Sequence, residues 1–167
     1  NALVLVASGG LGREVSLLLR APTLPGSELI LPVIANRWAR RQGNVLSRGL
    51  QLVGVKGGPD VAQAWHGFES LGDAEHRRAF LATIRAVVGP EGQRLSAKEI
   101  LPQISVPTLV VWGALDSIIP VSHAVSAHDA VPGSSLEIFE QARHFPHRDE
   151  PDRFAALLLR FLASTEP

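Results

Sequence analysis

The sequence of 167 residues contains no cysteine, methionine or tyrosine. The absence of cysteine excludes a disulfide framework, a thiolate nucleophile and a zinc site with cysteine ligands. It is compatible with a reducing compartment, and we expect a cytoplasmic protein. Because Asn1 is not a methionine and the first residues lack the basic end of a signal peptide, we also expect that the chain begins within a longer protein.

Neither sign of charge predominates, and no hydrophobic run is long. Sixteen Lys and Arg residues balance sixteen Asp and Glu residues, so no positive excess points to nucleic acid or an anionic membrane. The longest apolar runs, such as residues 3–7 and 108–112, are far shorter than the about 20 residues that span a bilayer. With 46% hydrophobic residues the chain can bury a core, and we expect a globular protein whose partner is a small-molecule substrate.

Three short apolar runs, at residues 3–7, 108–112 and 136–139, predict strands, the first buried on both faces. Residues 121–131 predict a helix, and Pro151 begins another, in the favourable first-turn position. The apolar stripe of that last helix consists of Phe154, Leu157, Leu158, Phe161 and Leu162. The order of strand, helix, strand and helix predicts parallel pairing in an α/β layer architecture.

The region between the first two strands is broken by Pro and Gly into helical pieces. Residues 60–71 are a weak helical candidate. Residues 73–88 are a stronger one, with Asp73 as the N-cap and Gly89 at the end.

Two polar residues follow the second and third strands. Asp116 comes after the second strand, and His144, 28 residues later, after the third. Loops at the carboxyl ends of parallel strands open on the same edge of a sheet, so the two side chains can meet there. Such a carboxylate orients the imidazole and leaves its other nitrogen as a base toward a nucleophile. Without further motifs, however, an Asp after a strand is most often a turn former.

The segments around these two residues resemble those of α/β-hydrolases. Residues 107–120 are similar to the family's strand and acid loop, and residues 3–12 to the strand that leads into its helical cap. Residues 132–139 are similar to the family's last strand, residues 144–147 to its histidine loop and residues 150–151 to the start of its final helix. The order of acid and then histidine also matches, although Arg143 stands where the family usually has glycine.

The resemblance implies an α/β-hydrolase-like parallel sheet with a helical cap insertion. The core is expected at residues 1–12 and 104–167, with its N-terminal half missing, and the cap at 13–103. Asp116 and His144 are then the acid and the histidine of a catalytic triad. Four aromatic residues are candidates for the substrate pocket, although packing within the cap explains them more simply: Trp38, Trp65, Phe68 and Phe80.

The nucleophile of the family is not found in this sequence. No serine has glycine both two residues before and two residues after it, the pattern of the nucleophile elbow. We therefore expect a nucleophile upstream of Asn1, in a missing part of the same protein or in a second chain, and an inactive chain when residues 1–167 are alone. A homo-oligomer is compatible with this expectation.

The predicted function is hydrolysis of an ester or related bond of a small apolar substrate, with serine favoured as the nucleophile. Esterase or lipase-like action competes with carbon–carbon bond hydrolysis, with haloperoxidase-like side activity and, given an Asp nucleophile, with epoxide or haloalkane hydrolysis. A non-catalytic binding or assembly protein of the same fold is the alternative. A flavodoxin-like domain is disfavoured, because it needs about five strands.

No metal or cofactor is predicted. His123 and His128 are five residues apart on the expected helix, which is not the spacing of a zinc-binding pair, and we expect them to be partly exposed. Residues 8–12 lack both the G-x-G-x-x-G pattern and the P-loop lysine, so they do not predict a nucleotide site.

Overall fold

The computed structural model describes residues 1–35 and 69–165, and the chain divides into two compact units. The first combines Asn1–Ser16 with Gly92–Pro167, and the second is Leu17–Glu91. Residues 13–16 and 92–103, placed in the insertion on sequence grounds, thus lie with the first unit. Backbone hydrogen bonds give the reason, since Gln93 donates to the Arg13 carbonyl at 2.8 Å and Ala97 to the Gly10 carbonyl at 2.7 Å.

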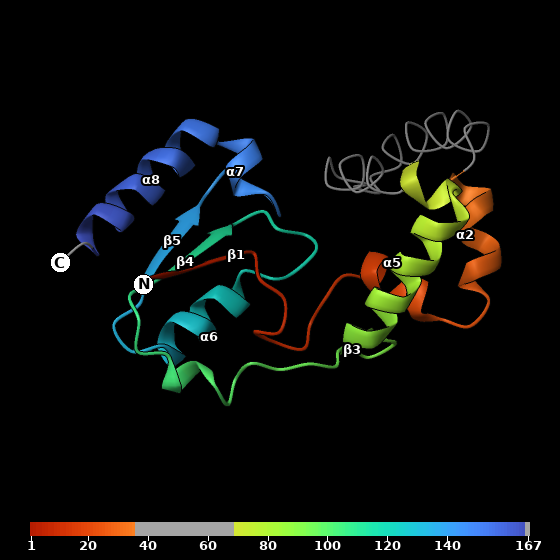
Figure 1. Cartoon of the computed structure of the whole chain (residues 1–167), viewed down its shortest axis with the longest axis horizontal. Helices are drawn as coiled ribbons and strands as arrows, with labels where there is room; N and C mark the ends of the chain where they lie inside the picture. Colours follow the sequence, from red (N-terminus) through yellow and green to blue (C-terminus); the bar gives the residue numbers. More distant parts are fainter. Residues whose placement is uncertain (36–68, 166–167) are drawn as a thin grey trace. The chain divides into compact units, whose positions relative to one another are not determined.

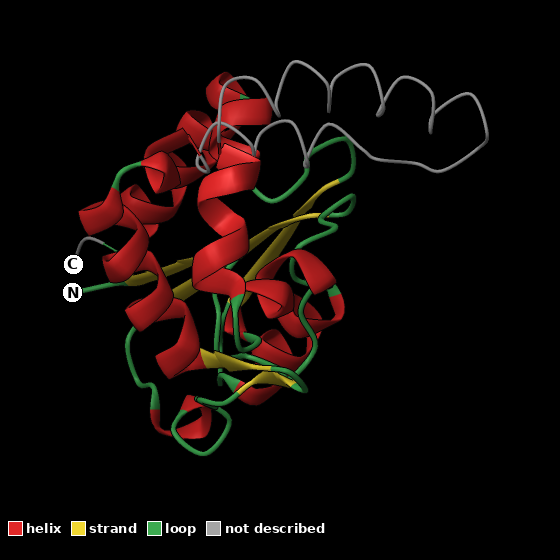
Figure 2. Ribbon diagram, turned by 90° about the vertical axis from the view of Figure 1, so that its right-hand side faces the viewer, coloured by secondary structure: helices red, strands yellow, loops and turns green. Residues whose placement is uncertain are grey.

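The first unit is built on a parallel sheet in the order β1-β4-β5 (Figures 1 and 2). Its strands are β1 (Leu3–Val6), β4 (Thr108–Gly113) and β5 (Ser135–Phe139). All of β4 is buried, because it lies between the other two strands. Every residue of β1 is partly buried within residues 1–167, so the burial on both faces that the sequence predicts for this strand is incomplete here. Among the strands that the structure describes, β1 pairs with β4 alone.

Helices cover both faces of this sheet (Figure 1). Helix α6 (Ser122–Ala130) lies on one face and buries Ala124 and Ala127 completely. Helix α8 (Pro151–Ser164) lies on the other, where three of the five residues predicted for its apolar stripe, Phe154, Leu157 and Phe161, pack against a buried cluster. The members of the cluster are Leu109, Val111, Phe139 and Ala142. Leu162, the last of the predicted stripe, is 42% exposed instead.

Four short elements remain, of which β2 belongs to the second unit and the other three belong to the first. They are β2 (Val88–Gly89), β3 (Gly92–Gln93), the 3₁₀ turn Leu101–Gln103 and α7 (Pro146–Asp149). Of these, α7 carries the chain from β5 toward α8, and it begins two residues after His144.

Apart from β2, the second unit is helical in its described part. Its helices are α1 (Leu17–Arg20), α2 (Ser27–Ala35) and α5 (Ala74–Val87), with 3₁₀ turns at Ala21–Thr23 and Glu69–Gly72. The Arg85 guanidinium lies 2.6 Å from the Glu28 carboxylate and so links α5 to α2. The weak helical candidate at 60–71 lies almost wholly outside the described residues.

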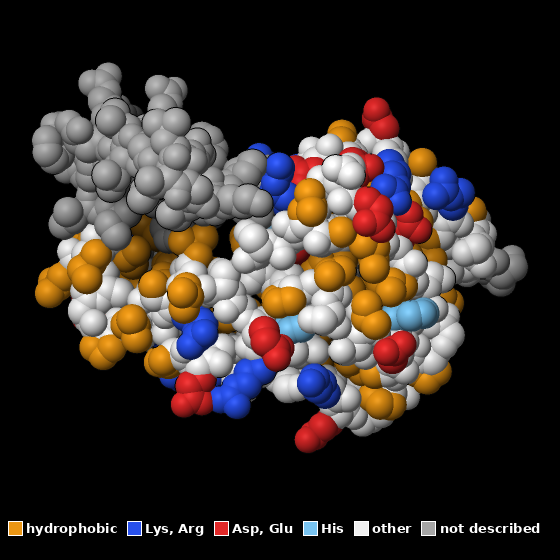
Figure 3. Space-filling view, turned by 180° about the vertical axis from the view of Figure 1, so that it is seen from behind, with side chains coloured by type: hydrophobic (Ala, Val, Ile, Leu, Met, Phe, Trp, Pro, Cys, Tyr) orange, Lys and Arg blue, Asp and Glu red, His pale blue; other side chains and the backbone are white. Residues whose placement is uncertain are grey.

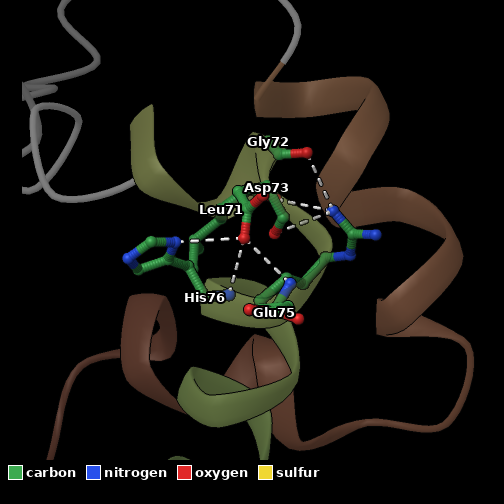
Figure 4. A network of polar contacts seen from close by, with 6 residues as sticks. Leu71, Gly72, Asp73, Glu75 and His76 are labelled. Atoms are coloured by element: carbon green, nitrogen blue, oxygen red, sulfur yellow. Dashed lines mark hydrogen bonds and ion pairs between the residues drawn. The ribbon is translucent and has the colours of Figure 1, made fainter.

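The start of α5 confirms the N-cap predicted at Asp73 (Figure 4). The Asp73 carboxylate accepts hydrogen bonds from the backbone N–H groups of Glu75 at 2.9 Å and His76 at 3.0 Å. These groups have no partner within the helix, so the cap stabilises its first turn. The backbone N–H of His76 is the main cause that lowers the pKa of Asp73.

Charged side chains of both signs lie close to one another on the described surface in view in Figure 3, as the balanced composition leads one to expect. Within residues 1–35 and 69–165, no helix has the length and apolar character needed to cross a membrane.

Candidate active site

Asp116 lies in the turn that follows β4. Its Oδ1 atom accepts hydrogen bonds from the backbone N–H groups of Ile118 at 2.8 Å and Ile119 at 2.9 Å. Its own backbone N–H donates to the Gly113 carbonyl at 3.2 Å, and its side chain has no exposed surface. Asp116 therefore stabilises the turn, as its position after a strand suggests. Only its Oδ1 atom accepts these hydrogen bonds, so Oδ2 is left for another partner.

His144 lies in the loop between β5 and α7, and its ring faces Asp116. The His144 Nδ1 atom is 2.9 Å from the Asp116 Oδ2 atom, and 18% of the histidine side chain is exposed. A carboxylate only accepts hydrogen bonds here, so the contact places a proton on Nδ1 and the lone pair of the neutral ring on Nε2. The structure thus brings together the two residues that the sequence placed at one sheet edge.

The loops that carry these residues are joined through their backbones. Leu115 donates to the Ala142 carbonyl at 3.0 Å, and Ala114 donates to the Phe139 carbonyl at 2.9 Å. A Cβ atom at Gly113 would collide with the carbonyl oxygens of Ala142 and Arg143. Glycine at the end of β4 is therefore required for the close approach of the two loops.

Arg143 fits into the histidine loop without backbone strain. Among the described residues other than glycine, Ala7 alone has a positive φ angle. Arg143 accordingly lies outside the left-handed region that would favour the glycine usual at this position.

Phe145 lies against the imidazole of His144. The two ring centroids are 4.8 Å apart, with an interplanar angle of 68°. On its other side, Phe145 contacts the ring of His147 at 6.0 Å, edge to face. His147 is exposed, and the centroid of its ring lies 5.8 Å from that of Phe154 in α8. This row of rings packs the residues that follow His144 against α8 and limits where the imidazole can turn.

The described structure does not test the aromatic candidates for the substrate pocket. Trp38, Trp65 and Phe68 lie outside the described residues. Phe80 is a partly buried residue of α5 in the second unit. Their contribution to a pocket remains a prediction.

A second histidine–carboxylate pair was missed by sequence reasoning. The His123 Nε2 atom is 2.9 Å from the Glu14 Oε2 atom, although the residues are 109 positions apart. His123 is 3% exposed, so the expectation of a partly exposed pair was wrong for it. The reason is Gly12, where a Cβ atom would collide with the imidazole ring. His128 is partly buried, and its Nδ1 atom lies 2.9 Å from the Ser134 hydroxyl.

The contact with His123 lowers the pKa of the Glu14 carboxylate. The hydrogen bond to the His123 ring is the main cause that lowers the pKa of Glu14, and a hydrogen bond from its own backbone N–H adds to the effect. No local sequence pattern predicts this pair, because Glu14 lies in a loop and His123 lies in the first turn of α6.

Comparison with known proteins identifies the family of this chain. The model of the alpha/beta hydrolase family matches residues 1–157. This chain belongs to that family, which confirms the resemblance of its acid and histidine loops and the predicted fold class.

The relatives are longer than this chain. An uncharacterised protein of Mycobacterium tuberculosis is 34% identical over 178 residues, which cover 100% of this chain and 50% of that protein. The 2-hydroxy-6-oxo-6-phenylhexa-2,4-dienoate hydrolase of Delftia acidovorans is 27% identical over 165 residues, or 97% and 54%. The crystal structure of the esterase RhEst1 from Rhodococcus sp. ECU1013 has a TM-score of 0.58 at 22% identity, covering 99% and 56%. The chain thus spans about half the length of the relatives it matches.

Proposed function

We propose that the complete protein hydrolyses an ester or related bond of a small apolar substrate, with His144 as general base and then general acid and Asp116 as its orienting acid. The observation that carries this proposal is the 2.9 Å contact between His144 Nδ1 and Asp116 Oδ2. Membership of the alpha/beta hydrolase family supports the reaction class. The Delftia relative, named as a hydrolase, adds to this support.

The proposed reaction begins at Nε2 of His144. This nitrogen takes the proton of a serine hydroxyl as the serine oxygen attacks the carbonyl carbon, and it then gives the proton to the leaving group. Water repeats the sequence and releases the acid, so no proton is gained or lost in the cycle. The serine belongs to the part of the relatives' length that residues 1–167 do not span.

Asp116 suits the acid's part because its orientation is fixed before any substrate binds. Two backbone N–H groups hold Oδ1, so the carboxylate does not rotate when the ring becomes charged. Its burial, against the partial exposure of His144, strengthens the attraction between carboxylate and imidazolium. Preorganisation of this kind costs no rearrangement in the transition state.

A binding or assembly protein of the same fold is the second candidate. One observation favours it: no serine in residues 1–167 has the two glycines of a nucleophile elbow. If the protein is an enzyme, 2-hydroxy-6-oxo-6-phenylhexa-2,4-dienoate is a substrate to test beside simple esters, because the Delftia relative is named for its hydrolysis.

The test is active-site labelling of the complete protein with a fluorophosphonate, together with hydrolysis of short p-nitrophenyl esters and of the dienoate. We expect a labelled serine and a turnover that His144→Ala lowers by about 10³-fold or more. His76→Ala, which removes an exposed histidine of α5 in the second unit, is the control and should retain activity. An unlabelled protein without turnover would contradict the proposal and favour the binding candidate. So would a His144→Ala variant with undiminished turnover.

A further inference from the structure

The carboxylate of Asp149 reaches back to the residue that precedes His144. Asp149 is the last residue of α7, and its Oδ2 atom accepts a hydrogen bond from the backbone N–H of Arg143 at 2.7 Å. The backbone N–H of Asp149 in turn donates to the Phe145 carbonyl at 3.0 Å. These contacts close residues 143–149 into a loop, and His144 lies inside it.

The same stretch of backbone is held from the opposite direction by the acid loop. The Ala142 carbonyl accepts from Leu115, the neighbour of Asp116, at 3.0 Å. The carbonyl oxygens of Ala142 and Arg143 lie so close to Gly113 that no Cβ atom would fit between them. The chain that enters His144 is therefore fixed at its carbonyls by the turn of Asp116 and at its N–H by Asp149.

We propose that Asp149 is a positioning residue, which keeps the His144 imidazole within hydrogen-bond distance of Asp116. The imidazole is partly exposed, so water competes with Asp116 for Nδ1. Restraint of the backbone, added to the packing of Phe145, helps the ring keep one direction. Removal of the Asp149 acceptor frees the Arg143 N–H and lets residues 143–145 move, and the ring then spends part of its time turned away from the acid.

The chemistry of the contact separates its two possible contributions. The Arg143 N–H needs an acceptor oxygen, which either a carboxylate or an amide supplies. If positioning is the role of Asp149, Asp149→Asn keeps it and Asp149→Ala loses it. If the negative charge matters instead, the two variants behave alike.

The experiment compares Asp149→Ala, Asp149→Asn and the control Asp152→Ala in the complete protein. Asp152 is an exposed acid in the first turn of α8, so its removal changes the local charge without touching the loop. The first readout is the proton resonance of His144 Nδ1 in protein labelled with ¹⁵N-histidine, assigned by its loss in Asp116→Ala. The second is the dependence of kcat and KM on pH.

We expect Asp149→Ala to broaden or abolish the Nδ1 resonance and to lower kcat by about 10- to 100-fold with little change in KM, because misplacement of a catalytic group affects the chemical step. Asp149→Asn and Asp152→Ala should retain both signals. A wild-type resonance in Asp149→Ala would overturn the proposal, as would equal losses in the Ala and Asn variants. If Asp149→Ala does not fold, a lost resonance in folded Asp149→Asn still overturns it.

The inference rests on the proposed function only for its kinetic readout. If the wild-type protein proves inactive, the proposed function fails. The resonance of His144 still tests whether Asp149 holds the ring.

Discussion

The first unit contains two histidine–carboxylate pairs with the same separation of 2.9 Å and opposite burial. Asp116 has no exposed side-chain surface while His144 is 18% exposed. In the second pair His123 has 4% of its side chain exposed and Glu14 has 73%. In the Asp116–His144 pair the acid is buried and the imidazole is partly accessible. In the Glu14–His123 pair the imidazole is buried and the acid is exposed to water.

The difference teaches what distinguishes a candidate catalytic pair from a structural one. A base needs an accessible nitrogen and an acid that cannot turn away, and two backbone N–H groups give Asp116 that fixity. His123 is enclosed under Gly12, and its Nδ1 atom is buried without a hydrogen-bond partner in the described structure. Its contact with Glu14 ties α6 to the loop after β1, which is a structural task.

The largest expected effect comes from Asp116→Asn in the complete protein. The amide oxygen can still accept from Ile118 and Ile119, but the amide N–H₂ then faces His144 Nδ1 and favours the tautomer with its proton on Nε2. That ring cannot act as a base. We expect kcat to fall by about 10⁴-fold with little loss of stability, measured by ester hydrolysis and urea unfolding.

The matching change in the other pair is Glu14→Gln, which should leave ester hydrolysis within about twofold of wild type. Equal losses of activity from Asp116→Asn and Glu14→Gln would break the distinction between the pairs.

The next effect concerns the glycines beside each pair. An alanine methyl group at Gly113 meets backbone carbonyls, whereas the atoms nearest to one at Gly12 belong to the ring of His123. We expect Gly113→Ala to lower the free energy of unfolding by about 1–3 kcal/mol, as overpacking does, in urea titrations. The cost of Gly12→Ala should shrink when His123→Ala is added, because the obstacle is then gone.

Gly72→Ala is the control for both glycine variants, since a Cβ atom there meets nothing within 4 Å. If Gly113→Ala were as mild as Gly72→Ala, the two loops would not need the close approach seen between them.

The parts of the fold that the sequence predicts are those with a local signal. Strand β4 and helix α5 have their apolar runs, their glycines and the Asp73 cap within a few residues of one another. The meeting of Asp116 and His144 is long-range but still predictable, because parallel strands bring their following loops to one edge. The partial exposure of β1 depends on which strands flank it, and no pattern within Leu3–Val6 records that.

Contacts between distant loops escape such reasoning. The bond between Glu14 and His123 joins two segments whose closeness depends on the packing of α6 and on the missing side chain of Gly12. The bond from Arg143 to Asp149 is close in sequence, but it depends on the turn that α7 makes after His144. Neither hydrogen bond joins residues at a sequence spacing that would have predicted it.

The smallest expected effect is the pH dependence that Glu14 contributes. Its pKa is lowered in the folded protein, mainly by the His123 ring, so its stabilising contribution is present above the pKa of an unfolded glutamate and is lost as pH falls through the folded value. Glu14→Gln removes this contribution and should flatten the decline of the free energy of unfolding below about pH 4.5, measured by urea unfolding at a series of pH values. In a His123→Ala background the same substitution should flatten it less, because the main cause of the shift is already absent. A decline that is equally steep with glutamate and glutamine at position 14 would show that water screens the exposed carboxylate completely, and the pair would then stabilise the loop through packing of the imidazole alone.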